Sequence, residues 1–239
     1  MSEPQYAGQD LEALADIPNY QDWILRHFRP HLRGRVLEIG AGVGTLSARY
    51  RGAVDRAVLL EPAPNLISLL RDRFAGDAGV TVLGERLEDA VGAGRLQAAS
   101  FDAVVLINVL EHVDDDAAML STIASLLAPG APLLLFVPAL QWLFGSLDEL
   151  VGHRRRYGKS QLRAVIEGAG FAIRDLRFFD ALGVLPWYVT GRVIKAKTFD
   201  ERAAKIYDTI GVPIGSRAER LVSPPIGKNL LCVARRSRE

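Results

Sequence analysis

Short apolar runs alternate with amphipathic stretches along the first two thirds of the chain. Between residues 35 and 137 the apolar runs contain almost no polar side chains, which is typical of parallel strands that are buried on both faces. Because crossovers between parallel strands are right-handed, the alternation predicts a doubly wound α/β sheet. The predicted strands are 35–39, 56–60, 80–83, 101–107 and 132–137, and the predicted helices are 45–51, 64–75 and 115–128, with a further short helix within 85–99.

The two ends of the chain extend this core. Residues 10–32 show helical spacing that is broken near Pro18, and we expect residues 1–33 to form a helical cap. After residue 137 the pattern predicts a helix at 159–169, a strand at 171–179, a helix near 200–210 and a last strand, LLCVARR. A strand that follows a helical excursion suits an antiparallel edge. We therefore expect a mostly parallel, seven-stranded sheet with an antiparallel last strand in one domain, 34–239, with 139–158 and 181–226 as insertions on the substrate side.

Composition narrows the class of protein. The 239 residues are 49% apolar and 24% charged, which is typical of a globular protein with a substantial core. A formal net charge of +1 gives no basis for a nucleic-acid partner. The single cysteine, Cys232, excludes an intramolecular disulfide. The polar start and the lack of any apolar run of about 18 residues predict neither a signal peptide nor a membrane span, so we expect a cytoplasmic protein.

The first predicted strand ends in a turn unusually rich in glycine. Residues 36–47 read VLEIGAGVGTLS, with Gly40, Gly42 and Gly44 at alternate positions. Glycine at this density indicates unusual backbone angles or a close approach to a ligand, and the helix that follows offers unpaired N–H groups. The dinucleotide fingerprint is G-x-G-x-x-G, but Thr45 stands where its third glycine belongs. The turn therefore fits poorly with a bound pyrophosphate.

The pattern acid-x-Gly-x-Gly-x-Gly resembles motif I of the class I S-adenosylmethionine-dependent methyltransferases. The resemblance implies a Rossmann-like methyltransferase fold in which Gly40, Ala41 and Gly42 lie against the methionine part of S-adenosylmethionine. It also implies that Glu38 accepts a hydrogen bond from the cofactor's ammonium group, directly or through water. A glycine turn that only packed a helix on a strand would not require this acid.

Further residues of the cofactor site follow from the same resemblance. Glu61 and Pro62 end the second strand, where an acid accepts both ribose hydroxyls, although dinucleotide folds share this feature. After the third strand, Glu85 corresponds to the acid that meets the adenine amino group and Arg86 to the residue whose backbone meets the ring. The family usually has Asp at the Glu85 position, and Glu88 or Asp89 could serve instead. The expected cofactor site is completed by Asn108, after the fourth strand.

The resemblance covers residues 20 to 180 and is closest to bacterial small-molecule methyltransferases of the "methyltransferase domain 11/12" type. It implies methyl transfer to a small acceptor. Methylases that act on nucleobase or glutamine amino groups typically carry N/D-P-P-Y/F after the fourth strand, whereas residues 108–111 read NVLE, which favours O- over N-methylation. The alternatives are a non-catalytic cofactor-binding module and an NAD-dependent oxidoreductase.

Three residues are candidate bases or substrate-orienting groups. Methyl transfer requires in-line positioning, and a base helps if the acceptor carries a proton. His112 follows the fourth strand, and His153 and Tyr157 lie in the loop after the fifth strand, where this family has substrate residues; Glu111 is a further polar residue on that side. Packing at a helix start is the alternative role of His112.

A metal site is a separate hypothesis. Some ubiquinone-pathway O-methyltransferases carry Glu-x-x-Glu-His in the position of residues 108–112, which resembles a Mg²⁺ site. Here Asn108 replaces the first carboxylate, and hard divalent cations prefer several carboxylate oxygens. We therefore expect no metal.

The second half of the chain indicates the character of the acceptor. Its many large apolar groups predict an apolar wall, and Arg154, Arg155 and Arg156 suit a carboxylate or phosphate, unless they form a solvated charge run. Together they predict an amphipathic acceptor. Residues 181–197 are a candidate pocket lid, core or membrane-surface segment, because Trp187 and Tyr188 precede two lysines. The groups expected in the wall are Trp142, Leu143, Phe144, Phe178, Phe179, Leu185, Trp187 and Tyr188.

Overall fold

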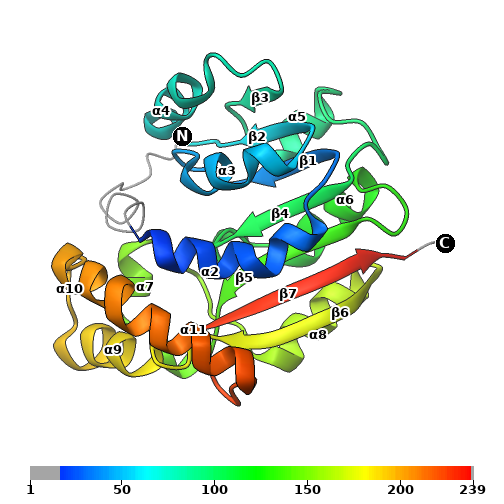
Figure 1. Ribbon diagram of the computed structural model, residues 1–239. Coiled ribbons are helices and arrows are strands. Elements are labelled where there is room, and N and C mark those ends of the chain that lie inside the picture. Colours follow the sequence, from blue (N-terminus) through cyan, green and yellow to red (C-terminus); the bar gives the residue numbers. More distant parts are fainter. Residues whose placement is uncertain (1–16, 238–239) are drawn as a thin grey trace.

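Seven strands form one sheet in the order β3-β2-β1-β4-β5-β7-β6 (Figure 1). The computed structural model describes residues 17–237. Strands β1 to β5 pair in parallel, and β7 is antiparallel to both of its neighbours, which confirms the predicted α/β fold. The strands are β1 Arg35–Ile39, β2 Arg56–Leu60, β3 Val80–Leu83, β4 Ala103–Ile107, β5 Pro132–Pro138, β6 Phe171–Phe179 and β7 Asn229–Arg236.

The position of β7 corrects one prediction. The last strand does not lie at the edge of the sheet but between β5 and β6. Its first six residues are buried without interruption, as in a strand with neighbours on both sides and layers above and below. Strand β6 has three buried positions among its nine, and the more exposed ones include Arg174, Asp175 and Arg177; such charged side chains are typical of an edge. The order of the last two strands thus follows from their burial patterns.

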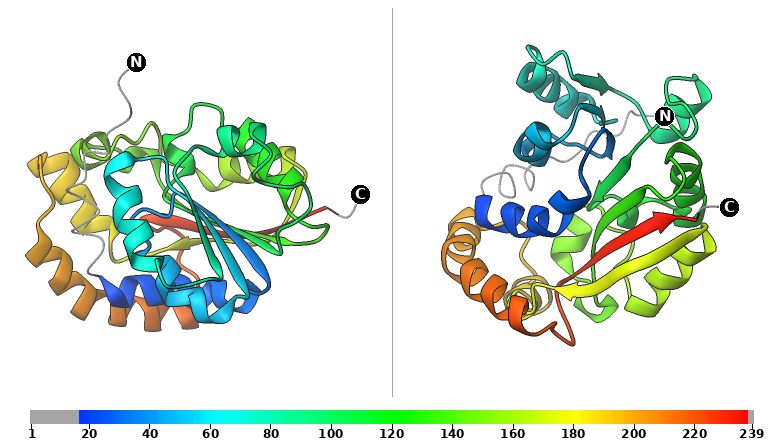
Figure 2. Two further views of the ribbon diagram at one scale, coloured as in Figure 1. Left: turned by 90° about the horizontal axis from the view of Figure 1, so that it is seen from above. Right: turned by 45° about the vertical axis from the view of Figure 1, so that its right-hand side comes forward.

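Helices cover both faces of the sheet (Figure 2). One apolar cluster joins Leu37 and Ile39 to α5, α6 and α8, and a second joins Val36 and Leu59 to α2, α3 and α4. Alternate residues of a strand point to opposite faces, which is why neighbours such as Val36 and Leu37 belong to different clusters. The helices are α2 Pro18–Phe28, α3 Thr45–Tyr50, α4 Pro64–Phe74, α5 Leu87–Gly92, α6 Asp116–Leu126, α7 Ser146–Leu150, α8 Lys159–Gly168, α9 Val184–Tyr188, α10 Glu201–Ile206 and α11 Val212–Leu221.

The insertion between β6 and β7 contains more helix than its sequence predicts. Helix α9 continues into a π-helical turn, Val189–Ile194, and α10 is joined to α11 by a second one, Tyr207–Gly211. Helical backbone therefore runs from 201 to 221 instead of ending near 210. The pattern of Gly211, Pro213 and Gly215 hides this continuity, because these residues are poor helix formers. Between residues 17 and 237, no helix is long and apolar enough to cross a bilayer.

Helix α2 begins at Pro18, whose fixed φ suits a first helical position. Residues 10–16 of the helical stretch predicted here lie outside the described part of the chain. Ile17, the residue before the helix, makes no side-chain capping hydrogen bond. Instead, Asp208 accepts the backbone N–H groups of Asn19, at 3.1 Å, and of Tyr20, at 2.8 Å. A carboxylate almost the whole chain away thus performs the function of an N-cap and ties α2 to the insertion.

We expect the substitution Asp208→Ala to lower the free energy of unfolding by about 2 kcal/mol, because it leaves two N–H groups of α2 without their partner, and that of Tyr20 is buried. Asp200 is the matched control, since it caps α10 from an exposed position within the same helix. Asp200→Ala should cost about 0.5–1 kcal/mol. Urea unfolding of both variants measures the difference. Equal losses would show that the long-range cap adds nothing.

Candidate active site

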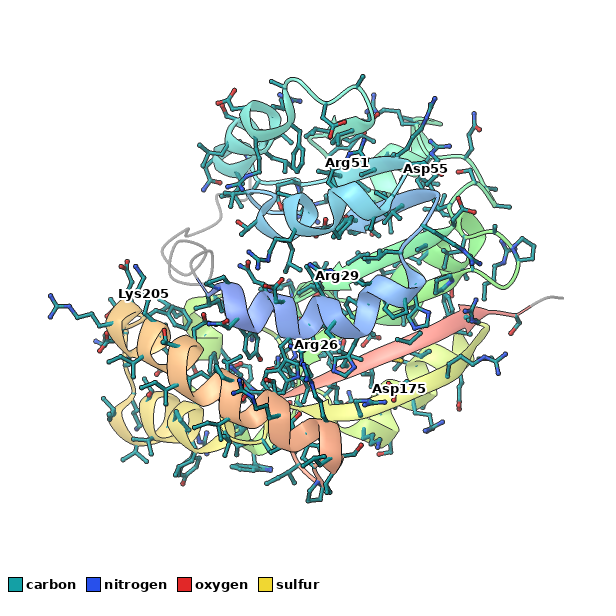
Figure 3. The ribbon with its side chains drawn as sticks, in the orientation of Figure 1. Arg26, Arg29, Arg51, Asp55, Asp175 and Lys205 are labelled. Atoms are coloured by element: carbon teal, nitrogen blue, oxygen red, sulfur yellow. The ribbon has the colours of Figure 1, made fainter. Side chains whose placement is uncertain are left out.

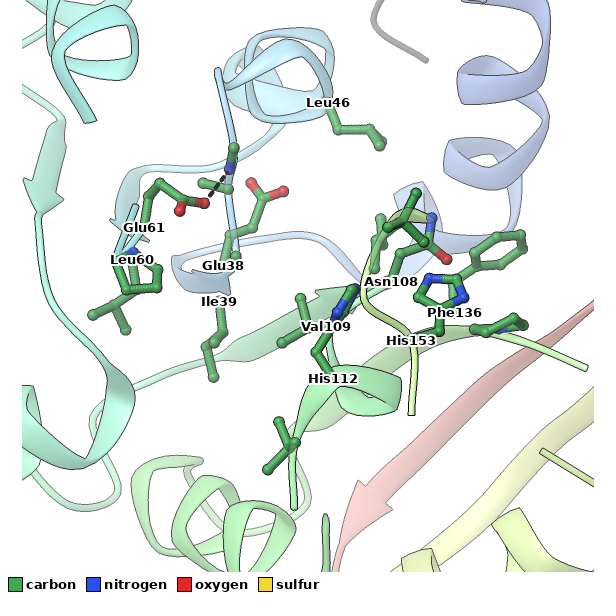
Figure 4. A pocket seen from close by; sticks show the side chains of 18 of the residues that line it. Glu38, Ile39, Leu46, Leu60, Glu61, Asn108, Val109, His112, Phe136 and His153 are labelled. Carbon is green, nitrogen blue, oxygen red and sulfur yellow. Dashed lines mark hydrogen bonds between the residues drawn. The ribbon is translucent and has the colours of Figure 1, made fainter. Parts of the chain in front are cut away.

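A cavity of about 800 Å³ opens at the carboxyl ends of β1, β2 and β4. In open α/β sheets this is where ligands bind, because the strand order reverses there. Figure 4 shows Glu38 and Glu61 on one side of the cavity and His112 and His153 on the other. All nine residues of the expected cofactor site line it: Glu38, Gly40, Ala41, Gly42, Glu61, Pro62, Glu85, Arg86 and Asn108.

The glycine turn after β1 depends on left-handed backbone. The φ angles of Gly40, Gly42 and Gly44 are 74°, 57° and 77°, a region that other residues adopt only at a cost. A Cβ atom at Gly40 would lie 2.4 Å from a methyl carbon of Val109, and one at Gly44 would lie 2.6 Å from Leu70. Packing inside the protein therefore also requires these two glycines, whereas Gly42 lies in the cavity wall.

Glu38 presents a buried carboxyl group at this turn. Ser47 and Tyr50 donate hydrogen bonds to its Oε2 atom, the latter at 2.7 Å. Burial raises the pKa of Glu38 to about 7, although the two hydrogen bonds oppose the shift. A carboxylate in this position fits an ammonium group, which would favour its charged form. The Glu38 carboxyl group and its surroundings therefore suit the amino-acid part of S-adenosylmethionine.

Glu61 links the second strand to the glycine turn. One of its oxygens accepts the N–H of Gly42 at 2.8 Å, the dashed line in Figure 4, and the other accepts that of Ala63 at 2.8 Å. A carboxylate oxygen has two lone pairs, so each oxygen of Glu61 can still accept a hydrogen bond from a hydroxyl group. Glu61 therefore fits a ribose with two adjacent hydroxyls while its orientation is fixed by the backbone.

The remaining expected cofactor residues differ in their surroundings. Glu85 forms an ion pair with Arg95, so its carboxylate already has a partner besides any adenine amino group. The alternative acid, Glu88, also lines the cavity. Asn108 has a φ of 53°, which asparagine tolerates better than most residues, and its N–H bonds to the carbonyl of Phe136 at 2.9 Å. This sharp turn after β4 brings Asn108 into the wall.

On the opposite side, His153 is held by a buried aspartate that sequence analysis did not identify. Asp148 Oδ1 lies 2.8 Å from Nδ1 of His153 and 2.8 Å from Nε of Arg156. Burial alone would raise the pKa of Asp148, but the hydrogen bond from His153 and the Arg156 charge outweigh it and lower the pKa. With Nδ1–H donated to Asp148, the lone pair of His153 is on Nε2. This arrangement suits a histidine that accepts a proton.

His112 packs against His153 with ring centroids 4.9 Å apart. Its Nδ1 lies 3.2 Å from the carbonyl oxygen of Gly152. Close to His153, Glu111 is fully buried, and its Oε1 lies 3.5 Å from Nε2 of His153. Neither carboxyl oxygen has a hydrogen-bond partner within the described residues, and burial raises the pKa of Glu111 to about 8.

The same three side chains are able to hold a metal. Glu111, His112 and His153 each offer a ligand atom, and these atoms lie within 4.8 Å of one another. Two imidazoles and one carboxylate suit zinc or a similar transition metal better than Mg²⁺, which prefers oxygen ligands. The cluster thus differs from the carboxylate-rich pattern considered in the sequence.

Tyr157 does not reach the cavity, contrary to expectation. Its side chain is fully buried, and its hydroxyl donates to Asp116 at 2.8 Å, with the Leu110 carbonyl at 3.2 Å. The phenol therefore braces the segment after β4 and is removed from the candidates for a catalytic role.

The arginines next to Tyr157 also have internal partners. Arg154 pairs with Asp114, Arg155 with Asp116 and Arg156 with the buried Asp148. Of the three, Arg154 and Arg156 line the cavity. Because each arginine already pairs with an aspartate, the three are less suited to bind an anionic group of the acceptor than the sequence predicts.

The expected apolar wall is also corrected. Of its eight residues, only Trp187 lines the cavity, Leu143 and Phe179 are buried in the core, and Trp142, Leu185 and Tyr188 are exposed. Apolar lining comes instead from α2, β5 and the insertion. The contribution of α2 was missed from the sequence, as was that of Lys228, just before β7, and Asn229, at its start, because these residues belong to no local motif. The apolar side chains concerned are Ile17, Tyr20, Ile24, Phe136 and Phe199.

The sheet order, the glycine turn and the paired acids define a class I S-adenosylmethionine-dependent methyltransferase. A family model described as a methyltransferase domain matches residues 12–176, and the chain belongs to this family. The oxidoreductase alternative is thereby set aside.

Among curated relatives, a protein from Xanthomonas axonopodis pv. citri named ubiquinone biosynthesis O-methyltransferase is 37% identical over 155 residues, which cover 59% of this chain and 64% of the relative. The match thus spans less than two thirds of the relative's length.

Solved structures share the fold. An S-adenosylmethionine-dependent methyltransferase from Mesorhizobium loti superimposes with a TM-score of 0.61 at 18% identity, covering 92% of this chain and 100% of the other. A Haemonchus contortus phosphoethanolamine N-methyltransferase 2 in complex with S-adenosyl-L-methionine has a TM-score of 0.58 at 20% identity, covering 92% of this chain and 53% of the other. A protein named for N-methylation thus shares this architecture.

We expect the affinity for S-adenosylmethionine to depend on pH through Glu38. The pKa of Glu38 is raised to about 7, so ionisation and hence attraction of the ligand's ammonium group increase as pH rises through that value. Between pH 5.5 and 7.0 the dissociation constant should fall roughly tenfold. Isothermal titration calorimetry would measure this, with NAD as a ligand that should not bind.

Glu38→Gln is the matched variant, because it keeps the shape of the side chain but does not titrate. It should bind more weakly at pH 7 and show a flat profile over the same range. A Gln variant that keeps the slope of the unaltered protein would contradict the assignment of Glu38.

Proposed function

We propose that the chain transfers the methyl group of S-adenosylmethionine to an oxygen atom of a small amphipathic acceptor. The observation that carries this proposal is the position of His153, which is held by the buried Asp148 and lines the same cavity as Glu38 and Glu61. A module that only bound the cofactor would not require an oriented histidine opposite the cofactor residues. Sequence relatives named as O-methyltransferases support oxygen as the acceptor atom.

In this proposal the cofactor supplies a methyl group on a positively charged sulfur, which is an excellent leaving group. The carboxylates of Glu38 and Glu61 and the glycine turn hold the cofactor, and the opposite wall holds the acceptor hydroxyl in line with the methyl carbon. As the new O–C bond forms and the C–S bond breaks, His153 Nε2 takes the hydroxyl proton. The Asp148 carboxylate stabilises the imidazolium that results.

The acceptor side is formed by the segments outside the central sheet. The predicted cap contributes Tyr20 and Ile24 through α2, the first insertion contributes His153, and the second contributes Trp187 and Phe199. We propose that residues 17–33, 139–158 and 181–226 act together as this side of the site. Its aromatic and aliphatic surface favours an apolar body on the acceptor, and its few polar groups favour a polar end.

A direct test is a screen of acceptors with S-adenosylmethionine, followed by mass spectrometry of the products. We expect methylation of hydrophobic hydroxy acids, phenols or lipid-linked saccharides at oxygen, because these match a cavity with an apolar wall and a base. Turnover confined to small water-soluble amines would refute the proposed acceptor.

His153→Gln should lower kcat by about 10²- to 10⁴-fold while leaving the affinity for S-adenosylmethionine unchanged, since the base contributes only to proton transfer. Asp148→Asn should lower kcat less and shift the pH profile, because the imidazolium loses its stabilising charge. His31→Gln is the control, as this histidine lies outside the cavity lining.

A chelator distinguishes catalysis by a histidine base from catalysis by a bound metal ion. Activity should persist in EDTA if His153 acts as a base. Activity that is lost in EDTA and restored by zinc or manganese would instead assign Glu111, His112 and His153 to a metal.

A further inference from the structure

The second insertion exposes most of the large apolar side chains found on the described surface. Of fourteen such side chains between residues 17 and 237, twelve lie between 182 and 226, and Trp142 contacts Tyr188 of the same segment. Scattered apolar side chains are normal on a surface, but a concentration of this size marks an interaction site. The most exposed are Leu185, Val193, Ile194, Ile206, Leu221 and Val222, each at least 62% exposed.

These side chains follow the helices at regular spacing. Leu185, Val189 and Val193 are four residues apart along α9 and its π-helical extension, and Ile206, Ile210 and Ile214 are four apart along α10 and α11. Such a stripe normally faces the core of a protein. Here both stripes are exposed, and both helical segments lie together at one end of the molecule, away from α4 and α5 (Figures 1 and 2).

The charges of this segment are mostly positive. Residues 181–228 contain eight basic and four acidic residues, although the whole chain has a net charge of only +1. Seven of the basic residues are exposed, among them Arg192, Lys195 and Lys197, and Lys205 projects outward from α10 (Figure 3).

Two of the four acids are turned inward. Asp208 caps α2, and Glu219 accepts the N–H groups of Asp180 and Ala181. The exposed face therefore combines apolar side chains with an excess of cations.

We propose that the exposed face of residues 182–226 binds the surface of a membrane that contains anionic lipids. Aliphatic side chains enter the boundary between headgroups and acyl chains, and the surrounding lysines and arginines contact lipid phosphates. A partner protein or a second copy of the chain would also cover apolar surface. The cationic surround favours lipid phosphates, because this chain is nearly neutral overall and a second copy would bring the same cations to the contact.

The face also borders the cavity. Trp187 and Phe199 belong to the same insertion but line the cavity. Leu185 and Val189, two residues before and after Trp187, are exposed. An amphipathic acceptor dissolved in the membrane would thus meet the cavity close to the bilayer surface. This consequence rests on the proposed function, whereas membrane binding itself does not.

Sedimentation with lipid vesicles tests the proposal without any enzymatic readout. The full chain should bind vesicles of phosphatidylcholine mixed with phosphatidylglycerol, bind pure phosphatidylcholine much less, and lose binding as salt increases. The double variant Ile210→Asp/Ile214→Asp should reduce binding at least tenfold, and Lys195→Glu/Lys197→Glu should reduce binding to the anionic vesicles selectively. Leu69→Asp is the control, because Leu69 is similarly exposed but lies on α4.

Unchanged binding of S-adenosylmethionine would show that each variant is folded. The proposal is overturned if the chain binds neither kind of vesicle, or if the double variant and the Leu69 variant behave alike. A dimer that dissociates only in the double variant, without vesicle binding, would assign the face to a second copy of the chain. Vesicle binding by a protein that methylates no acceptor would leave this proposal standing and refute only the proposed function.

Discussion

The hydrogen bond from the Gly42 amide to Glu61 connects the turns that follow β1 and β2, and the candidate site depends on it. The amides of Gly40 and Ala41 also bond to the Leu60 carbonyl, so the glycine turn is attached to the end of the neighbouring strand at three points. Left-handed angles at the glycines make this path available. As a result Glu38 and Glu61, from two different strands, reach the same cavity wall in fixed orientations. The opposite wall of the cavity, which faces Glu38 and Glu61, is then the side where the methyl acceptor would bind.

Buried carboxyl groups without full compensation are costly, and two of them belong to this site. Glu38 and Glu111 both have a pKa raised by burial, to about 7 and about 8. Glu38 lines the cavity, whereas Glu111 is fully buried behind the lining. A buried carboxyl group with a raised pKa in a cavity wall is typical of a functional site, which is the case for Glu38. Ser47 and Tyr50 donate hydrogen bonds to Glu38, whereas Glu111 lies 3.5 Å from Nε2 of His153.

The elements that depend on local pattern were predictable from the sequence. Strands β1, β2, β3 and β6 have the predicted bounds, and the cofactor residues converge because carboxyl ends of neighbouring parallel strands meet at one edge. Features that depend on distant partners were not predictable: Asp208 caps a helix 189 residues earlier in the chain, and Tyr157 and Arg156 are buried against Asp116 and Asp148. The exposed stripes of the second insertion look like core in sequence, because spacing shows that a helix has an apolar face but not what covers it.

If Glu38 and Glu61 bind the cofactor, its reactive end is directed toward the two histidines. A crystal structure with S-adenosylhomocysteine, the demethylated product, would decide whether this is so. We expect the ribose hydroxyls within hydrogen-bond distance of Glu61, the ammonium group beside Glu38, and the sulfur facing His112 and His153. A ligand bound outside this cavity, or one whose sulfur faces away from the histidines, would contradict it.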